Sequence, residues 1–378
     1  MPVNRYRALL LMNVFNASLP YYFVSLLLLR QLGFSYTVIG TLSVVTELFG
    51  TAFDLPLSIC AQKFGYQRLL ILSHLFLLVA LGALMNGKLV FAFLAAVFMG
   101  LSESLSSGTL VSFNFDVLAN EQEYAKFLKN SNTIKCVFIA LVTIISPFLL
   151  KQSVLYPLIL SISFVMISLI FLLKLPNKIV KSDSKEASAL LSGIRLAPWQ
   201  LMILGVGFTT LIMVNNSYAS LLLTDKGISL DVLGIILFLF NLGMALRSYL
   251  KIEWKYTLVI PILVVLISMQ TEVHLIILLF LLIRILNANY NNQLMLKMNQ
   301  TIKENRAVAW SLYNFAMSIS FMLADFLARL IADRFGLLMV YRVCGLSATF
   351  YLIYYYWKSV SNPRTLTSHK HPMKPLIS

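Results

Sequence analysis

The sequence is short of charge, and that shortage excludes an ordinary soluble protein. Only 12% of its 378 residues are charged, whereas 59% are hydrophobic. Soluble domains carry roughly 25% charged residues, which keep their surfaces hydrated. The hydrophobic residues come in blocks of about 18–25, long enough to cross ~30 Å of hydrocarbon as helices. The sequence therefore predicts an all-α integral membrane protein.

Cysteines and cofactor motifs are scarce as well. Cys60, Cys136 and Cys344 lie far apart and show no metal or redox spacing, so we assign them to packing. The chain has no P-loop, and transport energy would have to come from an ion gradient, solute exchange or another subunit. A membrane-embedded enzyme would need a catalytic cluster at one interface, and the sequence shows no histidine–acid or metal-like cluster of that kind. We therefore expect no cofactor, no metal and no enzymatic activity.

The distribution of the positive charges along the chain indicates the membrane topology. The formal net charge is +15, but the basic residues are scattered between apolar blocks and form no continuous face for nucleic acid. Lysines and arginines at the termini, in the middle of the chain and in alternate loops outnumber those in the other loops by about four to one. Cytoplasmic loops are enriched in this way, so both termini are predicted to face the cytoplasm.

About twelve predicted spans divide into six plus six. The first covers residues 7–29 and is read as uncleaved, and the seventh covers residues 201–223. Between the sixth and seventh, the polar interval from Lys174 to Trp199 contains no spanning run. We predict an N-terminal six-helix bundle over residues 1–174, a cytoplasmic linker over 175–199, a C-terminal six-helix bundle over 200–360 and a cytoplasmic tail over 361–378.

Three stretches of the chain resemble landmarks of the major facilitator superfamily, especially its bacterial drug-exporter-like branch. Residues 54–68, DLPLSICAQKFGYQR, resemble the signature loop between the second and third spans, with Gln62 in place of the motif aspartate. Residues 107–118 resemble the end of the family's fourth helix, and residues 299–312 resemble the loop before its eleventh. The resemblance implies two bundles with a solute site between them. It also implies a cavity lined by the first, fourth, seventh and tenth helices.

Charges at bilayer depth are the first candidates for function, because each costs at least ~2.5–3.5 kcal/mol. Glu103 lies near the middle of the fourth predicted span, and Arg284 near the middle of the tenth. We hypothesise that Glu103 is a protonatable carboxylate coupled to transport, and that Arg284 is its counter-charge or an anion-binding group. The alternative is a static pair that holds the two halves in register. Glu47, in the second span, is a further proton site or a structural partner.

Polar residues on several spans suggest a cavity wall. The predicted substrate-binding residues are Arg284, Asn287, Asn291, Asn215, Asn16, Tyr22 and Asp325. Helical periodicity places Arg284, Asn287 and Asn291 on one stripe. Interhelical amide hydrogen bonds are the alternative. Asp325 also lies four residues before Arg329, for which a self-neutralising pair is the simpler account.

Three further charges, Asp54, Arg68 and Asp116, lie toward the predicted cytoplasmic ends of their helices. We interpret them as gating charges at the cytoplasmic mouth. The alternative is that they only extend to the membrane interface.

These features together predict a secondary active transporter that works by alternating access. The leading hypothesis is a proton-coupled exporter of amphipathic compounds, an antiporter that acts in efflux. The alternatives are an importer or uniporter of a polar metabolite on the same fold, or a non-transporting sensor, which Gln62 favours. The expected partners are a small-molecule substrate, protons and membrane lipids, without nucleic acid. The protein is expected as a multi-pass monomer in the cell membrane.

Overall fold

The computed structural model describes residues 3–118, 121–176, 199–246, 256, 259–301 and 306–361. Within these ranges, every regular element is a helix. Nine helices in the described ranges are long and apolar enough to cross a membrane, and shorter apolar helices cover Leu230–Gly243 and Val273–Asn287. The predicted all-α membrane architecture is therefore confirmed, and the predicted count of twelve spans is approximate.

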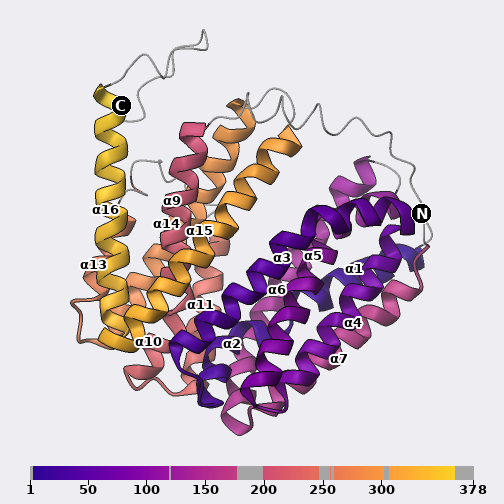
Figure 1. The fold of residues 1–378 in the computed structure, drawn as a ribbon, viewed down its shortest axis with the longest axis horizontal. Coiled ribbons are helices and arrows are strands. Elements are labelled where there is room, and N and C mark those ends of the chain that lie inside the picture. The colour runs from indigo at the N-terminus through magenta and orange to yellow at the C-terminus, as the bar shows by residue number, and fades with distance from the viewer. Residues whose placement is uncertain are drawn as a thin grey trace. The chain divides into compact units, whose positions relative to one another are not determined.

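The chain forms two compact units (Figure 1). The first consists of Met1–Ser184 and Ile228–Phe238, and the second of Lys185–Gly227 and Leu239–Ser378. The first unit contains α1 (Val3–Ala17), α2 (Pro20–Gln31), α3 (Tyr36–Phe64), α4 (Tyr66–Leu84), α5 (Leu89–Leu118), α6 (Glu121–Gln152) and α7 (Leu155–Leu173). The second contains α9 (Trp199–Ser217), α10 (Ala219–Asp225), α13 (Ile260–Ile267), α14 (Val273–Thr301), α15 (Arg306–Phe335) and α16 (Leu337–Ser361). Helix α11 (Leu230–Leu246) contributes to both units. Most of the predicted linker, and all of the predicted tail except Ser361, lie outside the described residues.

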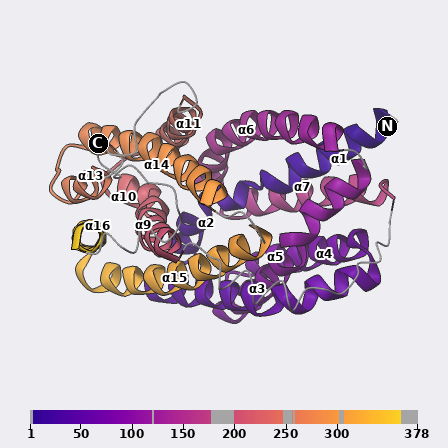
Figure 2. The same ribbon diagram turned by 90° about the horizontal axis from the view of Figure 1, so that it is seen from above.

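The first unit is built on two helix layers that share α4. Helix α5 packs along α3 and α4, and α7 packs along α1 and α4; Figure 2 shows these helices from above. Helix α7 explains why such a bundle suits a bilayer. Its serines Ser161 and Ser168 are fully buried, whereas Ile159, Met166 and Ile170 are exposed. Polar groups thus face the protein interior, and hydrocarbon faces outward to lipid.

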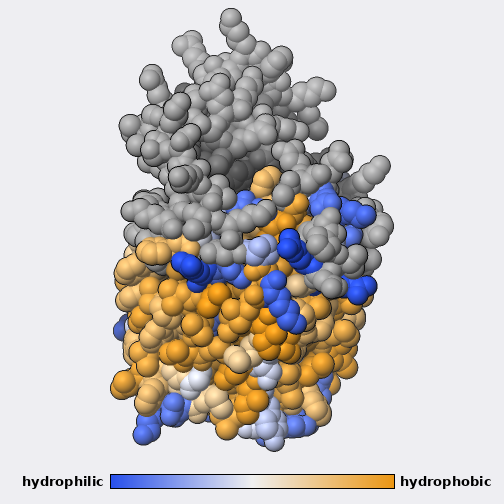
Figure 3. Space-filling view, turned by 90° about the vertical axis from the view of Figure 1, so that its right-hand side faces the viewer, coloured by the Kyte–Doolittle hydropathy of each residue, from blue (hydrophilic) through white to orange (hydrophobic). Residues whose placement is uncertain are grey.

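The surface follows the same rule on the face drawn in Figure 3. There, hydrophobic side chains form a broad band, with hydrophilic side chains at its borders. Among the exposed apolar residues of the chain are Val90, Leu141, Phe350 and Ile353. A soluble protein of this size rarely exposes so continuous an apolar surface. The band is therefore the surface that contacts lipid.

The second unit is held together by close approaches to α9. This helix packs against α15 and α16, and α16 also packs against α13. A Cβ atom added to Gly207 would lie 2.7 Å from the ring of Tyr351, and one added to Gly205 would lie 2.9 Å from the ring of Tyr313. Both glycines therefore provide room for tyrosines of the neighbouring helices. This close packing fixes α9 against α15 and α16.

Candidate functional site

The first span is interrupted at Ser18 and Leu19, where α1 ends and α2 begins. Leu19 is extended, with φ −69° and ψ 124°, and Pro20 opens α2. Proline suits the first turn of a helix because it lacks the N–H that would have no partner there. The N–H of Tyr21 instead donates to the Ser161 hydroxyl of α7 at 2.9 Å. Protein groups thus satisfy the freed backbone, as an interruption at membrane depth requires.

The seventh span is interrupted in the corresponding place of the second half. Helix α9 ends at Ser217, Tyr218 follows, and α10 begins at Ala219. The fully buried Tyr218 hydroxyl donates to Oδ1 of Asp325 at 3.2 Å. Interrupted apolar segments at matching positions of two halves are a pointer to the solute site in transporters. The hydropathy pattern predicts both spans as continuous and does not reveal these interruptions.

Asp325 and Arg329 form a buried pair beside the second interruption. Oδ2 of Asp325 accepts from Nε of Arg329 at 2.8 Å, and Nη2 of Arg329 lies 2.7 Å from the same oxygen. Because Tyr218 donates to the other oxygen, the protein itself engages both carboxylate oxygens. The expected one-face arrangement is observed. A direct role for Asp325 in binding substrate stays a prediction.

Several other polar side chains of the second unit are buried without such partners. The amide of Asn215 on α9 is 1% exposed, and neither its nitrogen nor its oxygen has a hydrogen-bond partner among the described residues. The same holds for the Oδ1 atoms of Asn216 and Asn287 and for Nε of Arg284. Buried polar groups in native proteins are usually paired with protein, water or ligand. Of the predicted cavity residues, Asn215, Arg284 and Asn287 thus have hydrogen-bonding capacity to spare.

Tyr341 of α16 brings these residues into one region. Its hydroxyl donates to the backbone oxygen of Asn215 at 3.3 Å, and its ring stands edge-on to Phe280 at 5.7 Å. Phe280 lies one helical turn before Arg284 on α14, and Tyr341 is an electrostatic neighbour of that arginine. Asn287 follows Arg284 on the same stripe. Asn291 belongs to α14 too, but its side chain lies outside the described part.

In the first unit, Glu103 lies against the crossing of α3 and α5. The two backbones meet where a Cβ on Gly100 would be 2.3 Å from the Thr46 carbonyl oxygen. One turn further along α5, the Glu103 carboxylate oxygen Oε2 lies 3.8 Å from the Cβ position of Gly50. The side chains of Glu47 and Tyr22 lie close enough to this carboxylate to interact with it electrostatically. The structure therefore brings the two predicted proton-coupling residues together with Tyr22.

Glu103 is exposed on the surface of its own unit, although it lies within the apolar span Leu89–Ser107. Its carboxylate makes no ion pair with any basic residue that the structure describes in the first unit. Tyr22 is also exposed, at 43%. These side chains are therefore available to a ligand or a proton at membrane depth.

The amides of the first span divide into two kinds. Asn13 and Asn114 bridge α1 and α5 through reciprocal hydrogen bonds of 3.0 and 3.1 Å. Asn13 is thus a packing residue. Asn16, the predicted substrate-binding amide, is half-buried two residues before the first interruption. Its role stays a prediction.

His74 belongs to the core of the first unit. Its Nδ1 atom donates to the Leu70 carbonyl oxygen at 2.7 Å, and its Nε2 atom is 2.9 Å from the Ser168 hydroxyl. The same hydroxyl reaches the Met12 carbonyl at 3.0 Å. The chain of contacts joins α4, α7 and α1, as expected for a core histidine with satisfied hydrogen bonds.

The predicted gating charges are placed as follows. Asp54 is exposed on α3 beside Ser107 of α5. Arg68 is exposed in the first turn of α4, and Asp116 is half-buried near the end of α5. Gating remains a prediction for all three.

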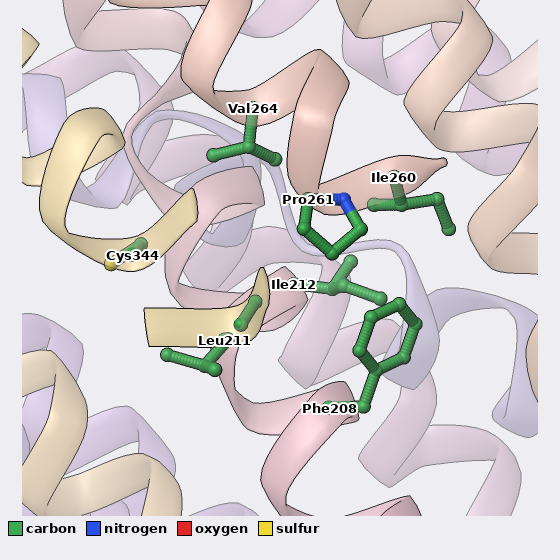
Figure 4. Close-up of a pocket in the computed structure, with 8 residues that line it drawn as sticks. Phe208, Leu211, Ile212, Ile260, Pro261, Val264 and Cys344 are labelled. Atoms are coloured by element: carbon green, nitrogen blue, oxygen red, sulfur yellow. The ribbon is translucent and has the colours of Figure 1, made fainter. Parts of the chain in front are cut away.

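A small pocket in the second unit is apolar. Figure 4 shows Phe208, Leu211 and Ile212 of α9 facing Ile260 and Pro261 of α13. Cys344 is also among its lining residues. The pocket offers no group that would orient a polar solute, so the polar region around Tyr341 is the stronger candidate.

Comparison with known proteins shows similarity in fold. No family model and no curated protein match the sequence. Among solved structures, a mutant of the nucleoside transporter NupG has a TM-score of 0.74 at 12% identity, covering 94% of this chain and 98% of that one. A bacterial homolog of the human lysosomal transporter Spinster, inward-facing and unoccupied, has a TM-score of 0.74 at 12% identity and covers 99% and 100%. A D-xylose–proton symporter has a TM-score of 0.69 at 12% identity, covering 94% and 96%. The chain therefore has the major facilitator fold, as its motifs predict.

Proposed function

We propose that this membrane protein is a secondary active transporter, an exporter of amphipathic small molecules driven by proton antiport. It works by alternating access as a monomer in the cell membrane, with both termini in the cytoplasm. The major facilitator fold supports the transporter class, and the neighbours in that fold include a nucleoside transporter and a xylose–proton symporter. Export and an amphipathic solute follow the resemblance of residues 54–68 and 107–118 to the drug-exporter-like branch, and proton coupling is inferred from Glu103.

The observation that carries proton coupling is the placement of Glu103. An ionised carboxylate in an apolar span is unfavourable unless it takes up a proton or pairs with a cation. Glu47 beside it raises that cost, since two nearby carboxylates cannot both ionise cheaply in a medium of low dielectric. Exposure of Glu103 at the unit surface lets its surroundings change during a transport cycle. Its proton would then be taken up on one side and released on the other.

Each of the two interrupted spans supports a solute-contacting region in its own unit. Asn16 and Tyr22 flank the first interruption, and Asn215 and Asn216 precede the second. Irregular backbone at bilayer depth is tolerated where it is buried in protein or lines a cavity. We infer that these residues contribute to the walls of the solute pathway.

A second candidate function is import or uniport of a polar metabolite. The buried amides and arginine of the second unit favour it, because an apolar drug would leave them without partners. Vesicle experiments separate the candidates. A proton antiporter accumulates solute in the vesicle lumen while protons flow out of it, and a proton-coupled importer accumulates solute while protons flow in. A uniporter does not accumulate solute.

The test is solute flux in proteoliposomes with an imposed pH gradient. Three probes that share a phenyl ring and cross lipid poorly are used: benzenesulfonate, phenyltrimethylammonium and phenyl glucoside. With an acidic lumen, we expect at least one probe to accumulate, up to about tenfold per pH unit for one-for-one exchange. The Glu103→Gln variant should lose this gradient dependence while still exchanging solute in the absence of a gradient.

The matched control is Glu272→Gln, which removes an exposed carboxylate at the start of α14. It should behave like the native protein. Proton antiport is wrong if the gradient has no effect on the native protein, or if Glu103→Gln keeps its gradient dependence.

A further inference from the structure

We propose that the solute carries an oxyanion group, such as a carboxylate, sulfonate or phosphate, which binds to Arg284, and neutral polar groups that bind to Asn215 and Asn287. This inference rests on the proposed transport function, because it names the chemical class of the transported solute. It is carried by buried polar groups of the second unit that lack protein partners.

Arg284 is a cation without an ion-pair partner among the described residues of its own unit. It lies in the apolar stretch Val273–Asn287, where an uncompensated charge is costly. Among the described residues of the second unit, no carboxylate forms an ion pair with it. Asp325, a buried acid of the same unit, is already engaged by Arg329 and Tyr218. Nε of the guanidinium has no hydrogen-bond partner among the described residues, and the planar fork of the group matches an oxyanion in geometry.

The two amides add neutral hydrogen-bonding capacity nearby. Asn215 is 1% exposed with both amide atoms unpartnered, and Asn287 is 9% exposed with an unpartnered Oδ1. A carboxamide presents both a donor and an acceptor, so it suits hydroxyl, amide or amine groups and needs no charge. An unsatisfied buried amide is destabilising, and a ligand that hydrogen bonds to it removes that cost.

Tyr341 holds these groups in one region. It hydrogen bonds the backbone of Asn215 and packs on Phe280, one turn before Arg284. Next to Asn287 on α14, the ring of Tyr290 meets Phe208 of α9 edge-on at 4.7 Å. The polar groups thus adjoin an aromatic wall, and a solute with both an oxyanion and an apolar body fits this combination.

The test is binding of the same three probes to the full-length protein in detergent, measured by calorimetry and by the shift of the melting temperature. Benzenesulfonate should bind and raise the melting temperature, whereas phenyltrimethylammonium should not. Arg284→Gln should weaken benzenesulfonate binding roughly tenfold to a hundredfold, since it removes hydrogen bonds from a charged group. Arg284→Lys should recover part of the loss.

Two further variants protect the test from a folding artefact. Asn287→Asp places a carboxylate one turn from Arg284 as an internal counter-charge. We expect it to fold stably and still lose benzenesulfonate binding. Arg342→Gln removes an exposed arginine next to Tyr341 and should bind like the native protein.

Three results would overturn the inference: equal binding of the cation, native-like benzenesulfonate binding by both Arg284→Gln and Asn287→Asp, or loss of binding in Arg342→Gln. Failure of the proposed function looks different. Benzenesulfonate would then bind through Arg284, but no probe would move with the pH gradient. Gradient-driven flux of phenyltrimethylammonium alone would instead support transport and reject the oxyanion.

Discussion

At the scale of single residues, the same amino acid serves two purposes in this protein. Asn13 and Asn215 are both buried asparagines in the first spans of their halves. Asn13 is satisfied by Asn114, a residue 101 positions away, whereas the Asn215 amide has no described partner. The sequence predicts that an amide at this depth is either paired or functional. It does not reveal which, because the deciding partner is brought close only by folding.

The buried Asp325–Arg329 pair leads to a prediction about stability. Arg329→Ala leaves the carboxylate of Asp325 buried without its cation, and breaking such a pair costs about 3–5 kcal/mol. We expect a marked fall in the melting temperature of the purified protein. Arg334→Ala, which removes an exposed arginine from the end of the same helix, should change it little. A native-like melting temperature for Arg329→Ala would contradict a bracing role for the pair.

At the scale of helices, periodicity and hydropathy predicted the spans but not their interruptions. Pro20 offered a signal for the first, because proline at the start of a helix is a common N-terminal marker. No proline or glycine stands beside Tyr218, and the local signal is the weaker one of the polar run Asn215-Asn216-Ser217. The hydrogen bond that Tyr218 makes to Asp325 on another helix could not be foreseen from that run.

The α3–α5 crossing leads to a prediction about packing. Gly100→Ala puts a Cβ 2.3 Å from the Thr46 carbonyl oxygen, so the two backbones must separate. We expect a loss of about 1–3 kcal/mol, typical of overpacking, and impaired proton coupling because Glu103 is displaced. Melting temperature and gradient-driven flux measure the two effects.

Gly82 provides the matched control. It lies inside α4, and a Cβ there meets nothing within 4 Å. Gly82→Ala should therefore be neutral or slightly stabilising, as expected for alanine in a helix interior. If both substitutions have the same effect, close approach at Gly100 is not what positions α3 and α5.

At the scale of the whole molecule, composition and block length sufficed for the membrane class, and the motifs predicted the major facilitator fold. The drug-exporter-like branch remains a proposal, since its distinguishing features are side chains in a cavity and not the fold. Charge asymmetry between loops predicted the orientation, which the fold alone does not define. Topology is therefore the large-scale expectation most in need of measurement.

Two exposed residues near opposite ends of α4 test the orientation of the first unit. In a chain with its native cysteines replaced, Lys88→Cys lies between α4 and α5, and Arg68→Cys lies at the start of α4. Intact cells treated with a membrane-impermeant maleimide should label Lys88→Cys, whereas Arg68→Cys should react only after permeabilisation. The opposite pattern would place the termini outside.

The interruption at Ser18 and Leu19 has a mechanical consequence. A continuous helix resists bending because its i to i−4 hydrogen bonds must stretch together. At this point the Tyr21 N–H is bonded sideways to Ser161 of α7 and not along the helix axis. The first span therefore consists of two helices connected by a non-helical segment, and the start of the second helix is hydrogen bonded to α7. Bending at this point breaks no hydrogen bond within α1 or α2, but any displacement of the start of α2 must carry α7 with it or break the bond between Tyr21 and Ser161.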